Sequence, residues 1–404
     1  MTFSSLPDYS NRIENDLRQN ILPFWIEKVT NHQDRTFFGS LTNDLVTDIS
    51  AERGALLTTR ILWTYAAAYR RYRDPAYLAM ADHAYHDLIT RFHDREHGGF
   101  WWSIAADGTV QRDRKQIYGQ AFAIYALAEY HAATARREPL AVAIATFQLI
   151  EKHSRDRTHG GYFEAFTRTW DPIADMRLSL VDMNEPKSQN THLHILEAYT
   201  NLLRMWSNAE LRQALAKLIN IMLTQIANPH TGHLGLFFAD DWTPRSDRIS
   251  YGHDIEASWL FTEAANVVKD IPLALRTDAF AVTLANATLI EGVDDDGGIY
   301  NEGSPNGPTN TNKEWWPQAE GLVGFLNAYQ ISRQKHFLEA ALHTWDFIEQ
   351  KIIDRNHGEW VRGVSRDGRV LENELKVSFW KCPYHNGRAG LEAVSRLRTI
   401  AALP

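Results

Sequence analysis

A short turn motif recurs six times along the chain, and this repetition limits the folds that the chain can adopt. The motif reads DREHGG from residue 94, DRTHGG from residue 156 and DRNHGE from residue 354. Weaker copies begin at residues 34, 228 and 294, so that successive copies lie roughly sixty to seventy residues apart. Because self-similarity at a fixed period is typical of repeat architectures, we interpret the chain as six copies of one structural unit.

Each unit contains two helical stretches of different character. The stretch before a turn, such as 75–92 or 337–352, has the apolar spacing of a half-exposed helix. The stretch after a turn is apolar on most sides, as in a buried helix. These buried stretches lie at 53–72, 118–134, 190–206, 252–268, 315–330 and 384–400. Six inner helices alternating with six outer helices predict an all-α fold, an (α/α)6 barrel. No linker divides the chain, so we expect one catalytic domain over residues 1–404.

The bulk composition narrows the classes of partner. The 404 residues include 42 Lys and Arg against 50 Asp and Glu, a net charge of −8, which argues against nucleic acid or an anionic membrane. No apolar run reaches the ~18 residues of a membrane span, and the N-terminus lacks the features of a signal peptide. The single cysteine, Cys382, allows no intramolecular disulfide, which fits a cytoplasmic location. The aromatic content of 11% favours a sugar ligand or, alternatively, core packing.

Polar residues on the buried stretches are the candidates for a functional site. Three of the stretches align on a shared tyrosine, and the residue five positions earlier is polar in each, as Arg60, Gln120 and His194. A position that only packs would keep one type of residue, so we interpret this position as part of a site built by divergence. Independent local hydrogen bonding is the alternative.

His192 and His194 stand two residues apart in NTHLH. On a helix, at ~100° per residue, they point about 200° apart and cannot ligate one metal ion. Asn190 and His194 are four residues apart and share a helix face. His194 is therefore the better candidate for the site, and we expect His192 to pack behind it.

Two further histidines begin other buried stretches. His253 and Glu256 in GHDIEASW share a helix face, and a carboxylate there can orient an imidazole. His385 stands with Arg388 in YHNGR. The common metal-binding spacings and nucleotide fingerprints do not occur in the sequence, so we expect no metal and no cofactor. Three imidazoles with an arginine are suited to moving protons near neutral pH.

The histidines of the turn motif itself are expected to be structural. His97, His159 and His357 recur because the turn recurs. Weaker copies of the motif carry other residues in that position, which a required catalytic group would not tolerate. The neighbouring glycines suit a sharp turn.

Five stretches carry a resemblance to a known family: RGALLTTRILWTYAAAYR, NTHLHILEAY, YGHDIEASWL, WWPQAE with GFLNAYQ, and FWKCPYHNGR. Through them the chain resembles the cellobiose 2-epimerases of the N-acylglucosamine 2-epimerase superfamily, from about Asn20 to Arg398. The resemblance implies an (α/α)6 barrel and a cofactor-free epimerisation at C2 of a reducing-end sugar. It would interconvert cellobiose with glucosyl-mannose and lactose with epilactose. By position it implies four catalytic residues, Arg60, His194, His253 and His385. It also implies substrate contacts from Tyr118, Asp182, Asn190, Glu256, Trp316 and Trp380.

Such a reaction makes three demands on the site. The sugar ring must open, the C2 proton must leave one face and return to the other, and the enediolate must be held. We assign His253 and His385 to the two proton transfers. Arg60 would stabilise the enediolate oxygens, and His194 would assist ring opening or hold O1.

Supporting roles follow for three more residues. Glu256 is expected to orient His253. Trp316 and Trp380 are expected to stack on the sugar rings. Asn301 lies in a loop where at least one family member has tyrosine, so the preference for a disaccharide stays open.

Other functions also stay open at this point. One is a mannose 2-epimerase or a mannose–fructose isomerase of the same superfamily. Another is a glycoside hydrolase that uses Glu256 or Glu320 as a carboxylate catalyst. A third is a carbohydrate-binding toroid without catalysis. In each case we expect a small-molecule sugar as the partner and a monomer or weak homodimer.

Overall fold

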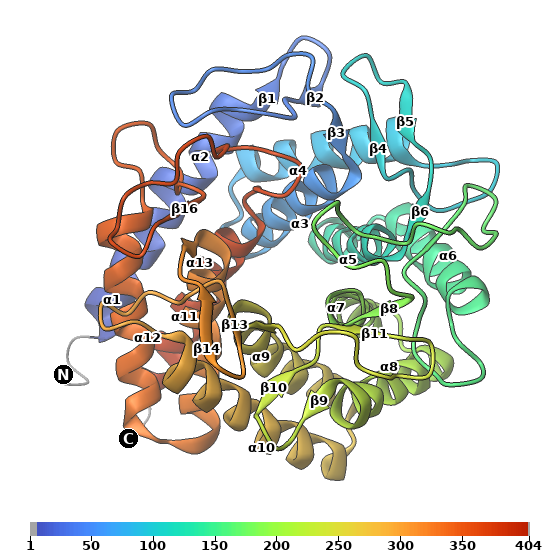
Figure 1. The fold of residues 1–404 in the computed structure, drawn as a ribbon. Coiled ribbons are helices and arrows are strands. Elements are labelled where there is room, and N and C mark those ends of the chain that lie inside the picture. The colour runs from blue at the N-terminus through green and yellow to red at the C-terminus, as the bar shows by residue number, and fades with distance from the viewer. Residues whose placement is uncertain (1–5, 403–404) are drawn as a thin grey trace.

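The computed structural model describes residues 6–402 and closes them into a ring of helices (Figure 1). The inner ring consists of α3 (Ala55–Tyr72), α5 (Ile117–Thr134), α7 (Gln189–Met205), α9 (Tyr251–Val268), α11 (Trp315–Ser332) and α13 (Tyr384–Ala401). Each inner helix packs against the next, and α13 packs against α3. The predicted (α/α)6 barrel is confirmed, with every inner helix within two residues of its predicted bounds. Residues 1–5, on which part of the signal-peptide prediction rests, lie outside the described range.

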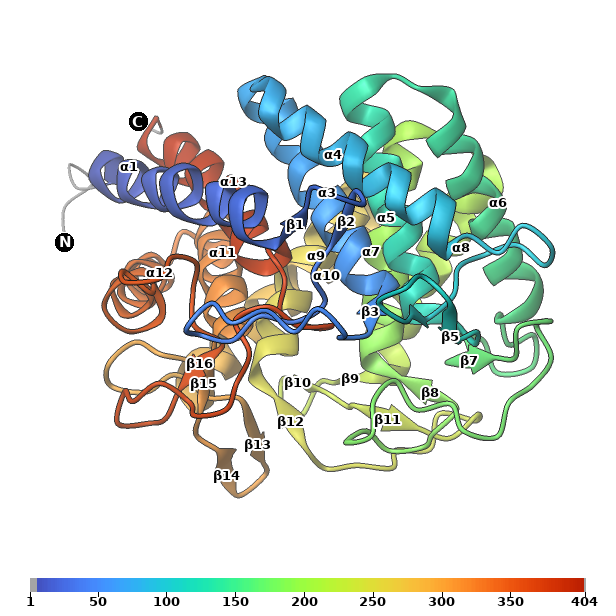
Figure 2. The same cartoon turned by 90° about the horizontal axis from the view of Figure 1, so that it is seen from above.

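The outer ring comprises α4 (Pro75–Asp87), α6 (Arg137–His153), α8 (Ala209–Ile221), α10 (Ile271–Ala287), α12 (Lys335–Phe347) and the N-terminal α1 (Leu6–Asp16) with α2 (Leu22–Phe24). Figure 2 shows α1 beside α13, so the first and last parts of the chain complete the barrel together. Most outer helices continue into a π-helical turn. These turns are η2 (Leu17–Ile21), η3 (Trp25–Val29), η4 (Leu88–Phe92), η5 (Met222–Ile226), η6 (Thr288–Gly292) and η7 (Ile348–Ile352).

One outer helix with its π-helical turn, Ile271–Gly292, is long and apolar enough to cross a membrane by length and composition alone. It packs against the inner helices α9 and α11. Because a helix that packs on a protein core passes the same test, this composition carries no argument for a membrane.

Short antiparallel strands join neighbouring repeats at the end of the barrel where the inner helices begin. In five places the strand that leads into an inner helix pairs with the strand that follows the next turn. The pairs are β3 (Arg53–Gly54) with β4 (Ser103–Ile104), β6 (Lys115–Gln116) with β7 (Ala165–Phe166), β8 (Lys187–Ser188) with β11 (Phe237–Phe238), β12 (Ile249–Ser250) with β13 (Glu302–Ser304), and β15 (Lys313–Glu314) with β16 (Gly363–Val364). The other strands are β1 (Thr30–Asn31), β2 (Thr36–Phe37), β5 (Val110–Arg112), β9 (Ala227–Asn228), β10 (His233–Leu234) and β14 (Gly307–Asn310). These pairings fix the starts of the inner helices relative to one another.

The recurring turn is a junction between an outer helix and the next inner helix. Asp156 accepts the backbone N–H groups of Thr158 and His159 with one oxygen, at 2.7 and 3.1 Å. Its other oxygen accepts from Lys187, a buried lysine that leads into α7. The same contact recurs in Asp94–Lys115 and Asp354–Lys376. The turn histidines His97, His159 and His357 have side chains that are 30%, 41% and 41% exposed, which fits a structural role.

The fourth residue of an inner helix anchors the preceding turn. Its side chain forms hydrogen bonds with the backbone of that turn. Gln120 binds Phe100, His192 binds Tyr162 and Gln318 binds Ile299. Gln120 therefore corresponds to His192, and its predicted alignment with Arg60 and His194 is wrong. Tyr125 stands two positions earlier in its helix than the tyrosines used to align α3 and α7. His192 is fully buried, as predicted.

In α9 the fourth residue is Asp254, and its carboxylate contacts His233. Asp254 accepts the N–H of Leu234 at 2.9 Å and lies 2.7 Å from Nδ1 of His233. Nε2 of His233 lies 3.2 Å from Glu291. Burial opposes protonation of His233, but the two carboxylates outweigh it and raise its pKa above 6.5.

We expect His233→Gln to destabilise the folded chain by about 1–3 kcal/mol at pH 6 and by less at pH 9. The pKa of His233 is higher in the folded than in the unfolded chain. Its contribution to stability is therefore complete below the unfolded value and is lost as pH rises through the folded value. Melting temperatures of both proteins between pH 6 and 9 check this. A difference that stays constant or grows toward pH 9 would contradict it.

Candidate active site

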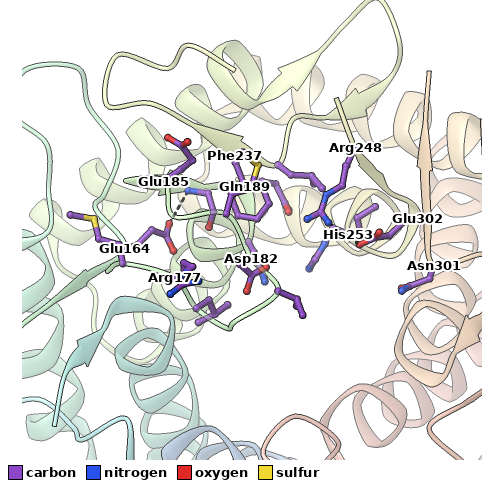
Figure 3. Close-up of a pocket in the computed structure, with 18 of the residues that line it drawn as sticks. Glu164, Arg177, Asp182, Glu185, Gln189, Phe237, Arg248, His253, Asn301 and Glu302 are labelled. Atoms are coloured by element: carbon purple, nitrogen blue, oxygen red, sulfur yellow. Dashed lines mark hydrogen bonds and ion pairs between the residues drawn. The ribbon is translucent and has the colours of Figure 1, made fainter. Parts of the chain in front are cut away.

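A cavity of about 240 Å³ opens at the end of the barrel that carries the strands (Figure 3). Four of the residues predicted from the sequence line it, namely Asp182, Asn190, His253 and Trp316. Asn301 lines it as well. Asp182 belongs to the loop before α7, where it accepts a hydrogen bond from Ser179 at 2.6 Å. The carbonyl oxygen of the Asn190 side chain is buried and has no hydrogen-bond partner among residues 6–402, so it is available to a ligand.

Ring contacts connect the cavity wall to His385. The ring of His253 lies 4.8 Å from that of Trp316, between centroids. The ring of Trp316 lies 5.7 Å from that of His385. Three residues from three inner helices thus form one continuous aromatic group.

A second aromatic group joins the remaining predicted residues. The ring of Tyr118 lies 4.8 Å from His194 and 6.1 Å from Trp380. The hydroxyl of Tyr118 accepts from Nη2 of Arg60 at 2.8 Å, and Nη1 of Arg60 donates to the Trp380 carbonyl at 3.3 Å. These residues come from α3, α5, α7 and the loop before α13.

Arg60 is a buried cation without a carboxylate partner. It is 3% exposed, and no aspartate or glutamate among residues 6–402 lies within ion-pair distance of it. Its guanidinium instead lies over the rings of Phe122, at 4.4 Å, and Tyr384, at 5.0 Å. Buried charges are normally paired, because an unpaired charge costs several kcal/mol of desolvation, on the order of 3–5 when a partner is removed. This arrangement prepares the site for an anion that arrives with or forms on the substrate.

His194 has a carboxylate partner on its own helix. Its Nδ1 lies 3.0 Å from Glu197. Burial lowers the pKa of His194 although Glu197 opposes the shift. Burial alone would raise the pKa of Glu197, but Arg388 and His194 outweigh it and hold that pKa below its ordinary value.

A network around Arg388 supports His385. Nη2 of Arg388 donates to Glu256 and to Glu320, each at 2.7 Å, and Nη1 donates to Glu197. Glu320 in turn lies 2.6 Å from Nδ1 of His385. Arg388 and His385 outweigh the effect of burial and hold the pKa of Glu320 at about 2. Glu320 is therefore an ionised acceptor, so Nδ1 of His385 carries the proton and Nε2 of the neutral ring is left free.

The prediction that Glu256 orients His253 is wrong. Nδ1 of His253 has no hydrogen-bond partner among residues 6–402, and Glu256 accepts from Arg388 instead. Glu256 lies 4.0 Å from Nδ1 of His385. The cause is the guanidinium of Arg388, which draws Glu256 toward the next helices of the ring. Burial lowers the pKa of His253 to about 3, so this imidazole is neutral near neutral pH.

Only one cluster among the described residues has the composition of a metal site. Ligand atoms of Glu256, Glu320 and His385 all lie within 4.8 Å of one another. The guanidinium of Arg388 already donates to both carboxylates, so this side chain supplies the positive charge between them.

Two residues that sequence analysis missed complete the site. Glu197 binds His194, and Tyr384 donates to Glu197. Both are buried. Glu197 stands three positions after His194, the same helical spacing that was noted between His253 and Glu256, and this spacing was the available signal.

The fold is an (α/α)6 barrel, and its site brings imidazoles from three inner helices together with a buried cation. The family model described as N-acylglucosamine 2-epimerase matches residues 36–386. A cellobiose 2-epimerase of Bacteroides fragilis is 43% identical over 381 residues, covering 94% of this chain and 97% of that protein. One of Dictyoglomus turgidum is 37% identical, covering 94% and 97%. The structure of cellobiose 2-epimerase from Spirochaeta thermophila has a TM-score of 0.90 and 40% identity, covering 98% of each chain. The chain belongs to the N-acylglucosamine 2-epimerase family, a family of carbohydrate epimerases.

Proposed function

We propose that the chain epimerises the reducing-end glucose of β-1,4-linked disaccharides at C2, converting cellobiose to glucosyl-mannose and lactose to epilactose. The observation that carries the proposal is Arg60, a buried cation with no carboxylate within ion-pair distance among residues 6–402, in a site that also gathers imidazoles from three inner helices. An enediolate is the anion that this charge would stabilise. The names and identities of the similar proteins support cellobiose as the first substrate.

Ring opening comes first in the proposed sequence. His194 lies against Tyr118, which also binds Arg60, so it stands where O1 would meet the guanidinium. Glu197 accepts from Nδ1 and leaves Nε2 of His194 to take the proton of the O1 hydroxyl and pass it to O5 as the C1–O5 bond breaks. The open chain exposes the aldehyde at C1, which makes the C2 proton acidic.

Proton transfer at C2 follows. One imidazole of the pair His253 and His385 takes the C2 proton, and the C2–H electrons form the enediolate held by Arg60. The other imidazole, which first takes up a proton from solvent, gives that proton to the opposite face of C2, and the aldehyde is restored. The first imidazole then returns the proton that it took from C2 to solvent. Each imidazole is the base in one direction and the acid in the other. The chemistry moves only protons, so it requires no metal or redox cofactor.

Recognition of the sugar is shared by the cavity wall and the neighbouring residues around Arg60. Trp316 and Trp380 would stack on the sugar rings, while Tyr118, Asp182 and Asn190 would bind hydroxyl groups. Glu256 acts through Arg388 and His385 rather than through His253, as the contact distances indicate.

The purified chain incubated with cellobiose, lactose, mannose and glucose tests the proposal. We expect glucosyl-mannose from cellobiose and epilactose from lactose, identified by chromatography against standards. Fructose formed from mannose, without any epimerised disaccharide, would favour the isomerase. Release of free glucose from cellobiose would favour a glycoside hydrolase and contradict the proposal.

A further inference from the structure

The last copy of the turn motif carries a glutamate where a glycine is expected. Glu359 has a φ of 62°, in the left-handed region. The corresponding residues of two other turns are Gly99 and Gly161, with φ values of 71° and 77°. A residue with a side chain is strained in that conformation, and such residues persist where the surroundings hold them in place. Glu359 is also fully buried.

The space beside this residue explains how the glutamate fits. A Cβ on Gly99 would lie 2.7 Å from Oε1 of Gln120, and one on Gly161 would lie 2.7 Å from Nε2 of His192. In those turns the anchoring side chain comes from the fourth residue of the following inner helix. In α13 the fourth residue is Gly387, which has no side chain. In the last repeat, a side chain of the turn, Glu359, therefore connects the turn to the inner helix. In the other two repeats a side chain of the helix, Gln120 or His192, makes this connection.

Every hydrogen bond of the Glu359 carboxylate is short and internal. Oε1 accepts from Nζ of Lys381 and from Nδ2 of Asn386, each at 2.6 Å. Oε2 accepts from Nε1 of Trp25 at 2.6 Å. Lys381 is fully buried, so the pair is a buried ion pair whose charges depend on each other.

Two of these partners are sequence neighbours of residues that have a role in the proposed reaction. Lys381 follows Trp380 directly, and Asn386 follows His385 directly. Residues 380–383 form no helix or strand, and two backbone hydrogen bonds, from Ser378 to Lys381 and from Gly387 to Pro383, hold the segment together with its side-chain contacts. Arg60 donates to the carbonyl of Trp380, which extends the same segment to the buried cation.

We propose that Glu359 is a positioning residue that fixes Trp380 and His385 through Lys381 and Asn386. This inference rests on the proposed function for the roles of those two residues. The strained backbone of the turn is kept because the glutamate carries out this positioning. A displacement of about 1 Å in a catalytic group can lower the rate by about 10²-fold.

Glu359→Gly tests the inference, because it restores the backbone that Gly99 and Gly161 show and removes the carboxylate. We expect kcat on cellobiose to fall about 10- to 100-fold and KM to rise, since His385 and Trp380 both lose their support. Glu359→Gln combined with Lys381→Met is a second variant, which keeps an acceptor for Asn386 and leaves no unpaired charge. It should fold and retain more of kcat than Glu359→Gly.

The matched control is Asp16→Asn in the same turn region. Asp16 is buried and accepts from Trp360 and Asn20, both at 2.8 Å, and it forms no hydrogen bond or ion pair with residues 380–386. Through Asn20 it is linked to the backbone N–H of Glu359 and not to the carboxylate. It should lower the melting temperature and leave kcat and KM unchanged. If Glu359→Gly lowers only the melting temperature, as the control does, Glu359 is a structural residue and the inference is wrong.

A crystal structure of Glu359→Gly gives a readout that does not depend on activity. We expect the contact between His385 and Glu320 to lengthen and Trp380 to move. An unchanged segment 380–386 would overturn the inference even if activity fell. If the unmodified chain epimerises none of the sugars, the proposed function fails, whereas this structural comparison still decides the role of Glu359.

Discussion

Replacing either His253 or His385 with alanine is expected to lower kcat for cellobiose by about 10³-fold or more. Each imidazole serves as base in one direction and acid in the other, so either loss removes a proton transfer from every turnover. Coupled or single-turnover assays of product formation measure the effect. Both variants should fold, because Nδ1 of His253 makes no hydrogen bond within residues 6–402 and Glu320 keeps its contact with Arg388.

The control for this pair is His159→Ala. His159 belongs to the repeated turn, and its side chain is 41% exposed. Its loss should leave kcat and KM unchanged. If His253→Ala or His385→Ala kept most of the activity, the assignment of two bases would be wrong.

Replacing Arg388 with methionine is expected to have the largest effect on stability, a loss of about 3–5 kcal/mol at pH 8. The guanidinium contacts Glu197, Glu256 and Glu320, and all three are buried. Without it, the carboxylates keep their cost of burial and lose their counter-charge. Urea unfolding at fixed pH measures the loss, and kcat should fall as well because Glu320 orients His385.

The pH dependence of this loss gives a sharper test. In the unmodified chain the pKa values of Glu197 and Glu320 are depressed, so they contribute stability above the unfolded value that is lost as pH falls through the folded value. Burial and Glu320 already raise the pKa of Glu256 in the unmodified chain, so the change on losing Arg388 falls mainly on Glu197 and Glu320. In the variant, burial raises the carboxylate pKa values, so the folded variant gains relative stability as pH falls. The difference between the two proteins should therefore shrink from pH 8 to pH 5. An equal difference at both pH values would contradict the network.

Lysine at position 388 should replace arginine only in part. A lysine ammonium is a compact point charge on a flexible stem, whereas the planar guanidinium holds carboxylates on two sides with fixed geometry. We expect Arg388→Lys to recover part of the stability and little of kcat. Full recovery of kcat would show that only the charge matters.

The periodicity of the chain was enough to predict the barrel, because a turn that recurs with a buried helix after it leaves few closed arrangements. The same reasoning placed the histidines, since a polar residue on a helix that is otherwise apolar must face a cavity or a partner. The alignment of Gln120 failed because it relied on Tyr125 alone. The turn contacts of Gln120 show its true register.

Contacts across the ring could not be predicted. Helical spacing pairs His194 with Glu197 and suggests His253 with Glu256, and only the first pair forms. Glu256 binds Arg388 instead, a residue 132 positions away in the sequence. The distances between inner helices decide this choice, and they depend on the packing of the whole barrel.

Epimerisation of cellobiose in heavy water, followed by NMR at early conversion, distinguishes epimerisation by two bases from the alternatives. With one imidazole removing the C2 proton and a different imidazole returning one, the proton added should come from solvent. We expect glucosyl-mannose with deuterium at C2 from the first turnovers and unreacted cellobiose that is still almost free of deuterium. Epimer that retains the original hydrogen at C2, or a ketose with deuterium at C1 as the main product, would contradict it.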